Sequence, residues 1–108
     1  MLFSWDEKKR QENWEIRKVD LLEAALIFAD PEVIESVDPR KEYGEERIQA
    51  LGQVDGTFYV VAYTWRGETR HLITAWKVGE NGRRRYEAVF ARRNQADEGK
   101  GPDEEDPG

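Results

Sequence analysis

The side chains of this chain that can carry proton or phosphate chemistry are one histidine and several arginines. His71 is the single histidine among the 108 residues, and histidine is the residue whose ordinary pKa allows proton transfer near neutral pH. It lies next to Leu72 inside a predicted strand, where a packed or hydrogen-bonded structural role is favoured over a catalytic one. Arginines gather at Arg83-Arg84-Arg85 and Arg92-Arg93. The first run either binds phosphates or forms the solvated start of a helix, and the sequence leaves both interpretations open.

Aromatic side chains are the second group of interest, because flat rings on a sheet can stack the bases of a nucleic acid. The predicted strands hold Tyr59, Tyr63, Trp65 and Trp76, although aromatic residues of a sheet more often fill the core. Signatures of other chemistry are missing from the sequence. It has no phosphate-binding glycine loop, no Cys/His metal set and no plausible Ser/His/Asp assembly. The sequence therefore predicts no cofactor and no metal site.

These residues are positioned by a hairpin that runs from Thr57 to Val78. Phe58 to Trp65 is apolar or aromatic on both alternating faces, which indicates a strand covered on both sides. Arg70 to Lys77 predicts the second strand, and Gly67 supplies the positive φ that a short turn favours. We therefore expect this hairpin to be the core of a sheet.

The remaining elements place helices before and after the sheet. Asp6 and Asp20 are predicted N-caps of two N-terminal helices, and periodic apolar residues predict a C-terminal helix. The expected order is an extended start at 2–5, helices at 7–18 and 21–29, strands at 33–37 and 46–54, the hairpin, and a helix at 83–93. This order predicts an α+β fold: a mainly antiparallel sheet of four to five strands, packed with two N-terminal helices and one C-terminal helix.

Length and composition indicate one domain over residues 1–93 and an acidic tail over residues 94–108. Of the net charge of −6, five negative charges lie in the tail, which has no large apolar residue and is predicted to be disordered. The chain has no cysteine, which is compatible with a reducing compartment. Its apolar runs are shorter than the roughly 18 residues of a membrane helix. We expect a cytoplasmic protein without membrane contact.

Short motifs follow one another in a fixed order along the chain. They are Phe3-x-Trp5-Asp6, Lys9, Asn13, Glu23-Ala24, Phe28-x-Asp30-Pro31, Asp38-Pro39-Arg40, Gly44-Glu45-Glu46-Arg47, Gly52, Tyr63-Thr64-x-Arg66-Gly67, Thr74-Ala75 and Arg83-x-x-Tyr86-Glu87. No single motif is specific, but their order and spacing together are. With them the chain resembles, from about Phe3 to Glu87, the BrnT-type toxins of bacterial type II toxin–antitoxin systems.

The resemblance implies a small RelE-like ribonuclease fold and a toxin that inhibits translation by cleaving RNA without a metal ion. In that chemistry the RNA 2′-hydroxyl attacks the adjacent phosphate, and the enzyme supplies a base, an acid and cations for the phosphorane. The implied partners are a cognate antitoxin and an RNA substrate, with operator DNA contacted only through the antitoxin.

Site roles follow from the same resemblance. Arg47 and Arg83 are expected to neutralise the phosphate and the transition state, Tyr86 to position the substrate or transfer a proton, and His71 to act as acid or base. Expected RNA contacts are Arg17, Arg66, Arg84 and Trp76.

The chain departs from the usual family pattern at three places, and these departures support a second hypothesis. Ile16-Arg17-Lys18 stands where the family has Lys-His-Gly, and Gly82 stands where a glutamate is usual. The strand from His71 to Trp76 replaces Arg-Ile-Ile-Ser-Ala-Arg. The alternative is a catalytically degenerate binding module of the same fold that pairs with an antitoxin and acts in regulation; a stand-alone structural domain is the third and less favoured hypothesis. The acidic tail is interpreted as solvating, rather than as an inhibitor that folds back over a basic face.

Overall fold

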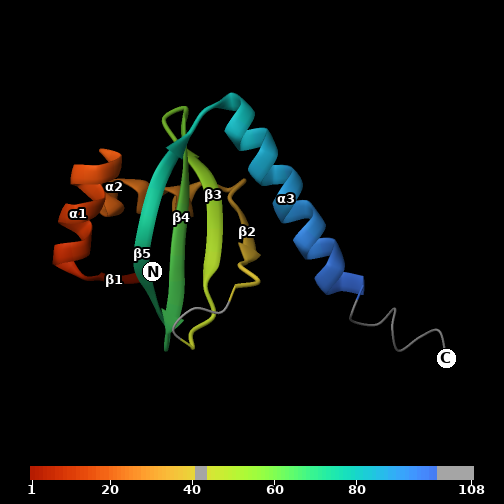
Figure 1. Ribbon diagram of the computed structural model, residues 1–108, viewed down its shortest axis with the longest axis horizontal. Helices are drawn as coiled ribbons and strands as arrows, with labels where there is room; N and C mark the ends of the chain where they lie inside the picture. Colours follow the sequence, from red (N-terminus) through yellow and green to blue (C-terminus); the bar gives the residue numbers. More distant parts are fainter. Residues whose placement is uncertain (41–43, 100–108) are drawn as a thin grey trace.

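The structure is a computed structural model that describes residues 1–40 and 44–99. Within these residues five strands form one sheet in the order β1-β5-β4-β3-β2, in which β1 is parallel to β5 and the other neighbours are antiparallel (Figure 1). The elements are β1 (Leu2–Trp5), α1 (Glu7–Arg17), α2 (Leu21–Ala24), the 3-10 helix η1 (Ala25–Ala29), β2 (Ile34–Val37), β3 (Ile48–Val54), β4 (Thr57–Arg66), β5 (Thr69–Val78) and α3 (Glu80–Gly99). The predicted α+β class, with helices before and after a mainly antiparallel sheet, is confirmed.

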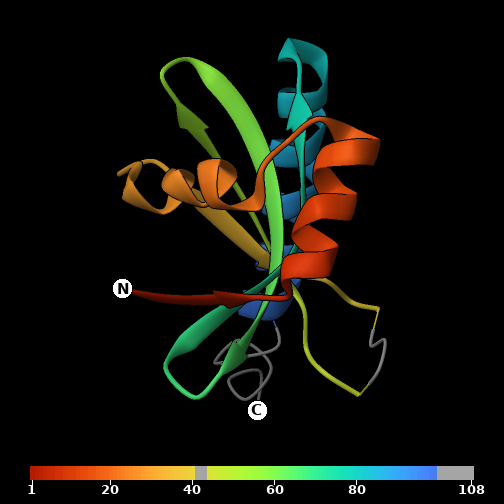
Figure 2. The same ribbon diagram turned by 90° about the vertical axis from the view of Figure 1, so that its left-hand side faces the viewer.

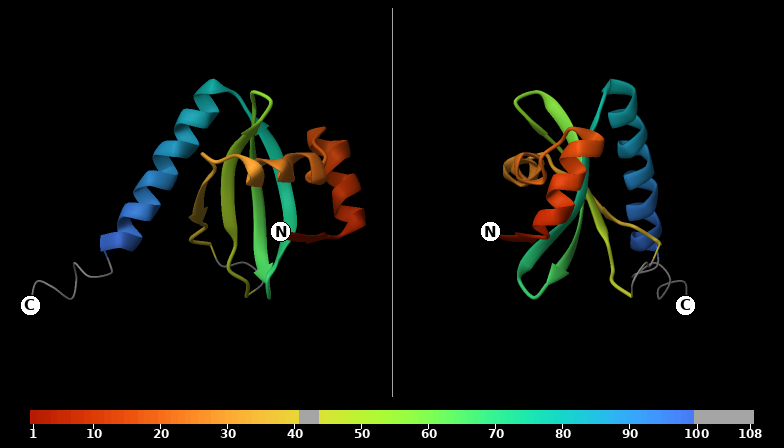
Figure 3. Two further views of the ribbon diagram at one scale, coloured as in Figure 1. Left: turned by 180° about the vertical axis from the view of Figure 1, so that it is seen from behind. Right: turned by 60° about the vertical axis from the view of Figure 1, so that its left-hand side comes forward.

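Both faces of the sheet are covered, as the two apolar faces of β4 predict. Tyr59, Val61 and Tyr63 belong to a core cluster under α2 and η1, and we call this side the α2 face. Val60 belongs to a second cluster with Phe90 of α3, and we call that side the α3 face. Seen along the sheet, α2 and η1 lie on one side and α3 on the other (Figures 2 and 3).

Helix α1 lies at the β5 edge of the sheet and is attached there by Asn13. Strand β1 pairs only with Thr69–Leu72, so the rest of this edge of β5 needs another partner. The Asn13 amide provides it: Oδ1 accepts from the Ala75 N–H at 3.2 Å, and Nδ2 donates to the Ala75 carbonyl at 3.0 Å. Nδ2 also donates to the Val19 carbonyl, and the Thr74 hydroxyl donates to Oδ1, both at 2.8 Å. Among the residues of α1, all of them described, Asn13 alone is buried.

The close approach of η1 to β3 requires a glycine. A Cβ at position 52 would lie 2.8 Å from Cβ of Ile27, and no side chain fits in that space. On the same side, the Asp30 carboxylate accepts a hydrogen bond from the Gln53 N–H at 2.9 Å. Gly52 therefore lets η1 lie directly on the sheet.

Helix α3 is longer than predicted at both ends. The sequence predicts a loop before Arg83 and an unstructured tail from Asn94, but the helix runs from Glu80 to Gly99. At its far end the Asn94 side chain donates to the carbonyl of Glu35 in β2, a polar contact that a prediction based on apolar content misses. The rest of the predicted tail, residues 100–108, lies outside the described residues. In the part of the chain that is described, no helix has the length and apolar character needed to cross a membrane.

The Asn13→Ala substitution tests the attachment of α1. It leaves the Ala75 backbone groups and the Val19 carbonyl without their side-chain partner, so we expect the free energy of unfolding to fall by about 3 kcal/mol. The Gln11→Ala substitution at an exposed position of the same helix should cost less than about 0.5 kcal/mol. Urea denaturation of both variants measures the difference, and equal losses would show that Asn13 does not hold the edge.

Candidate functional site

The α3 face changes from apolar to polar along the strands. Side by side across β2, β3, β4 and β5 lie Ile34, Leu51, Val60 and Trp76, and α3 packs on this row through Tyr86, Val89 and Phe90. The next row on the same face consists of Ser36, Gln49, Ala62 and Thr74. The apolar row is covered by the helix, and in the next row Ser36, Gln49 and Ala62 are buried as well. Thr74, at the β5 edge, is partly exposed.

A groove of about 330 Å³ opens between α1 and the start of β3. We call it the cationic groove, because the described residues that line it include three cations and one carboxylate. The lining residues are Lys9, Glu12, Asn13, Ile16, Arg17, Arg47, Ile73 and Thr74.

A β-bulge in β5 shapes the floor of this groove. Ala62 pairs with Thr74 and Tyr63 pairs with Leu72, so Ile73 is an extra residue between them. Both Ile73 and Thr74 line the groove, although successive residues of a regular strand point to opposite faces.

Three of the predicted site residues form a continuous line from α1 across β5 to α3. The Arg17 guanidinium carbon lies 5.0 Å from the ring centroid of Trp76, within range of a cation–π interaction. The Trp76 indole N–H donates to the Tyr86 hydroxyl at 3.1 Å. Arg17 also lines the cationic groove with Arg47. It therefore connects this groove to the aromatic rings of Trp76 and Tyr86.

His71 lies on the α3 face, further along the sheet toward β1. It pairs across the strands with Thr64, which is two residues from Ala62 on the same side of β4. Its Nδ1 shares a hydrogen bond with the Ser4 hydroxyl at 2.8 Å. Burial lowers the pKa of His71 below its ordinary value, and the nearby positive charge of Arg66 lowers it further. The imidazole is therefore neutral near pH 7.

Arg83 is the predicted catalytic residue that does not join this group. Its guanidinium is bonded to Glu80 at 2.6 Å and to Glu87 at 3.0 Å, and it lies 5.0 Å from the ring centroid of Phe58. Phe58 and Thr64, six residues apart on β4, mark the two ends of the face, roughly 20 Å from each other. The ion pairs fix the first turns of α3 instead.

Two predicted RNA contacts also lie away from the groove. Arg66, at the end of β4, is 3.4 Å from a carboxylate oxygen of Glu45. Arg84 is exposed on α3. None of Arg83, Arg84 and Arg85 is among the described residues that line the cationic groove with Arg17 and Arg47.

Sequence reasoning named Lys9 as a motif residue but assigned it no role in the site. The signal was present in the helical spacing, because residues 9, 12, 13, 16 and 17 lie on one side of a helix with 3.6 residues per turn. Gln49 was also missed; its side chain accepts a hydrogen bond from Arg93 at 3.4 Å. This contact joins α3 to the polar row and could not be read from the spacing.

The arrangement supplies charge and one neutral imidazole. Lys9, Arg17 and Arg47 can bind phosphate groups, and His71 can accept a proton near pH 7. Among the side chains that the structure describes, no three His, Cys, Asp or Glu residues come together as a group that could hold a metal ion.

The pKa of His71 can be measured directly, because the chain has a single histidine and one imidazole signal appears in an NMR titration. We expect a pKa below the ordinary value of about 6.5. The unfolded chain then binds the proton at a higher pH than the folded chain does. The free energy of unfolding therefore falls as the pH drops below about 6.5, the ordinary pKa of histidine. The Arg66→Gln substitution should raise the pKa only in part, because burial is the larger cause. A wild-type pKa at or above the ordinary value would contradict the buried, neutral state.

Comparison of the sequence with known proteins identifies a family to which the chain is similar. The family model described as "Ribonuclease toxin, BrnT, of type II toxin-antitoxin system" matches residues 5–81, which is more than half of the chain. This span includes Arg17, Arg47, His71 and Trp76 but ends before Tyr86. No curated protein matches the chain. The chain belongs to the BrnT family of ribonuclease toxins from type II toxin–antitoxin systems.

Proposed function

We propose that this protein is a toxin that cleaves RNA at the cationic groove and that a cognate antitoxin neutralises it. The observation that carries the proposal is the position of Arg17 over Trp76. The usual family pattern has a cation at position 76, and the guanidinium of Arg17 restores a positive charge above that position. The charge of the site is then kept, although the residue that carries it has moved from β5 to α1.

Single-stranded RNA is the substrate class that suits this surface. Proteins bind single strands through cations that contact the phosphates and flat groups that contact the bases. Lys9, Arg17 and Arg47 provide the cations along the groove. The Arg17 guanidinium is planar, and together with Trp76 and Tyr86 it provides flat groups for a base next to the bound phosphate.

In the proposed reaction the 2′-hydroxyl oxygen forms a new bond to the adjacent phosphorus, and the bond from phosphorus to the 5′-oxygen breaks. A base removes the 2′-hydroxyl proton, and an acid protonates the departing 5′-oxygen. Neutral His71 is the candidate base; with Nδ1 bonded to Ser4, proton transfer would use Nε2. Tyr86 is the candidate acid, because its hydroxyl accepts from Trp76 and can donate its own proton.

Arg17 and Arg47 are proposed to neutralise the charge that develops on the phosphorane. Stabilisation of this kind by fixed cations is often the largest contribution to such a reaction. Arg83 has no part in this version of the site, because its guanidinium is engaged by Glu80 and Glu87. Arg66 and Arg84 remain candidate contacts for RNA that extends beyond the groove.

Membership of a type II toxin–antitoxin family implies an antitoxin partner. Inhibition of translation would follow from the loss of RNA. Contact with operator DNA is proposed only through the antitoxin, because in this proposal the cations of the cationic groove bind RNA.

Alanine substitutions in the groove test the proposed site. We expect Arg17→Ala and Arg47→Ala each to slow RNA cleavage by the purified protein by about 10²-fold, and to relieve growth arrest when the protein is produced in bacteria. Lys8→Ala removes the same charge from an exposed position of α1 outside the groove, and it should leave cleavage unchanged. Cleavage rates and RNA integrity in cells are measured for all three variants, after urea denaturation has confirmed that each is folded.

Two results would contradict the proposal in different ways. If folded wild-type protein without its partner neither cuts RNA nor slows growth, the chain is a binding module of the BrnT fold. If the two groove variants cut RNA as fast as Lys8→Ala, the protein is a ribonuclease whose site lies elsewhere.

A further inference from the structure

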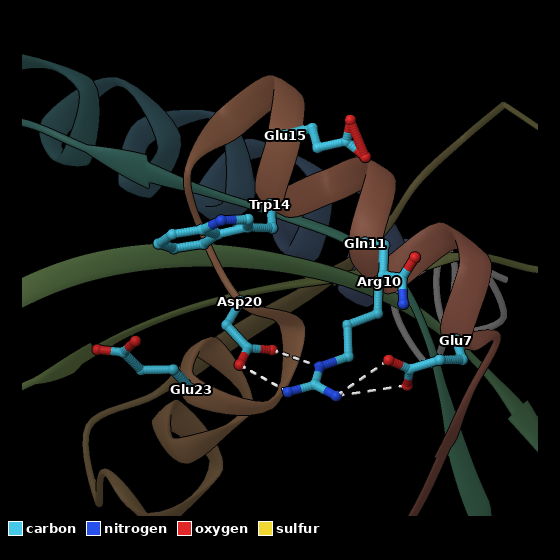
Figure 4. Close-up of a pocket in the computed structure, with 7 residues that line it drawn as sticks. All are labelled: Glu7, Arg10, Gln11, Trp14, Glu15, Asp20 and Glu23. Carbon is cyan, nitrogen blue, oxygen red and sulfur yellow. Dashed lines mark hydrogen bonds and ion pairs between the residues drawn. The ribbon is translucent and has the colours of Figure 1, made fainter.

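A second groove lies on the side of α1 that faces away from the cationic groove. It has a volume of about 570 Å³ and lies between α1 and the start of α2 (Figure 4). We call it the acidic groove, because the described residues that line it include four carboxylates and one cation. The lining residues are Glu7, Arg10, Gln11, Trp14, Glu15, Asp20 and Glu23.

The helical spacing explains why one helix lines both grooves. Residues 7, 10, 11 and 14 lie on one side of a helix with 3.6 residues per turn, and residues 9, 13, 16 and 17 lie on the other. Asn13 is the buried residue of α1, and the other residues of the helix remain accessible on both sides. Cations are in excess in the groove on one side, and carboxylates are in excess in the groove on the other.

The single cation of the acidic groove is already neutralised. Arg10 bonds to both carboxylate oxygens of Asp20, at 2.8 and 2.9 Å, and lies 3.3 Å from Glu7, as the dashed lines in Figure 4 show. These two carboxylates stay ionised: the Trp5 indole, and then Arg10, lower the pKa of Glu7, and Arg10 lowers that of Asp20.

Glu15 and Glu23 remain as excess negative charge in the groove, and Glu23 also accepts a hydrogen bond from the Tyr59 hydroxyl. Neither forms an ion pair within the described residues, and in Figure 4 both lie apart from Arg10. Their charge repels phosphate, so the groove does not suit RNA. It is complementary to a positively charged ligand.

Trp14 lies between Glu15 and Glu23 in this groove (Figure 4). Trp14 is 53% exposed, although an indole on a helix usually packs against the core. An exposed indole next to carboxylates is a binding place for a guanidinium or ammonium group, through cation–π attraction and burial of the side-chain stem. The carboxylates alone would attract a small free cation. The exposed indole in addition favours a cation on an apolar stem, as in the side chain of arginine or lysine.

We propose that the acidic groove binds a short segment of the antitoxin that carries arginine or lysine, with one basic side chain on Trp14 and its neighbours near Glu15 and Glu23. The proposal rests on the antitoxin partner that the family implies and does not depend on RNA cleavage. Charge complementarity and the exposed indole favour a basic peptide over the other occupants. Partner binding and RNA binding then use opposite sides of α1, so substitutions can separate them.

The first test uses a hexa-arginine peptide and the full chain. The Trp14 indole N–H signal should shift in an NMR titration, and Glu15→Gln/Glu23→Gln should weaken peptide binding by about fivefold, as expected for two surface charge pairs. The matched control, Glu32→Gln/Glu68→Gln, removes two exposed carboxylates elsewhere and should bind like the wild type. Equal binding by both double variants would overturn the proposal, because attraction would then come from the overall charge or from the acidic tail.

The second test uses the purified cognate antitoxin with the same variants and with Trp14→Leu. We expect Glu15→Gln/Glu23→Gln and Trp14→Leu to weaken the complex, while RNA cleavage without antitoxin keeps its wild-type rate. Antitoxin binding that is equal in all variants would show that the partner does not use this groove. If no variant cuts RNA, the proposed ribonuclease activity fails while the binding result still decides the assignment of the groove.

Discussion

The arrangement of this protein depends on one side-chain amide at the edge of a sheet. Strand β1 pairs with β5 only as far as Leu72, so the rest of this edge of β5 has no neighbouring strand. Exposed backbone groups at such an edge promote pairing with strands of other molecules. Asn13 offers one donor and one acceptor to the same residue, Ala75, as a strand residue would. Helix α1 is therefore held by hydrogen bonds rather than by an apolar stripe, and both of its flanks remain available to line grooves.

The α3 face of the sheet changes from apolar to polar along the strands. The helix packs on the row that contains Leu51 and Val60, and its polar residues continue the contact toward β2 and β3. Beyond that row the α3 face carries Gln49 and Thr74, which need hydrogen bonds rather than apolar cover. The switch between the two rows occurs within two residues of each strand. The α3 face thus combines an apolar row with a polar row in which Ser36 and Gln49 are also buried.

Local patterns predicted the elements of this fold well, whereas contacts between distant residues were beyond them. The caps at Asp6 and Asp20 are present, and the strand with two apolar faces lies between two cores. Nothing in the spacing indicated that Arg17 would lie over Trp76 or that Arg83 would be held by two glutamates. Position along the chain made the arginines near residue 83 resemble one patch with Arg47, but Arg83 lies over Phe58 at one end of the α3 face and does not line the groove that Arg47 lines. The family motifs identified Asn13 without giving its role, which only the pairing of β5 explains.

In the proposed site, the departures from the family pattern keep a positive charge although they change the residue that carries it. A phosphorane requires positive charge near its oxygens, and a cation reached from a neighbouring helix meets that need as well as one on the strand itself. With tryptophan at position 76, the indole provides a flat surface that orients the Arg17 guanidinium and a donor that fixes Tyr86. A lysine at position 17 would not reproduce this arrangement, because an ammonium group is not planar and stacks less well. The same exchange makes the proposed site dependent on α1, and hence on the amide of Asn13 that holds this helix against β5.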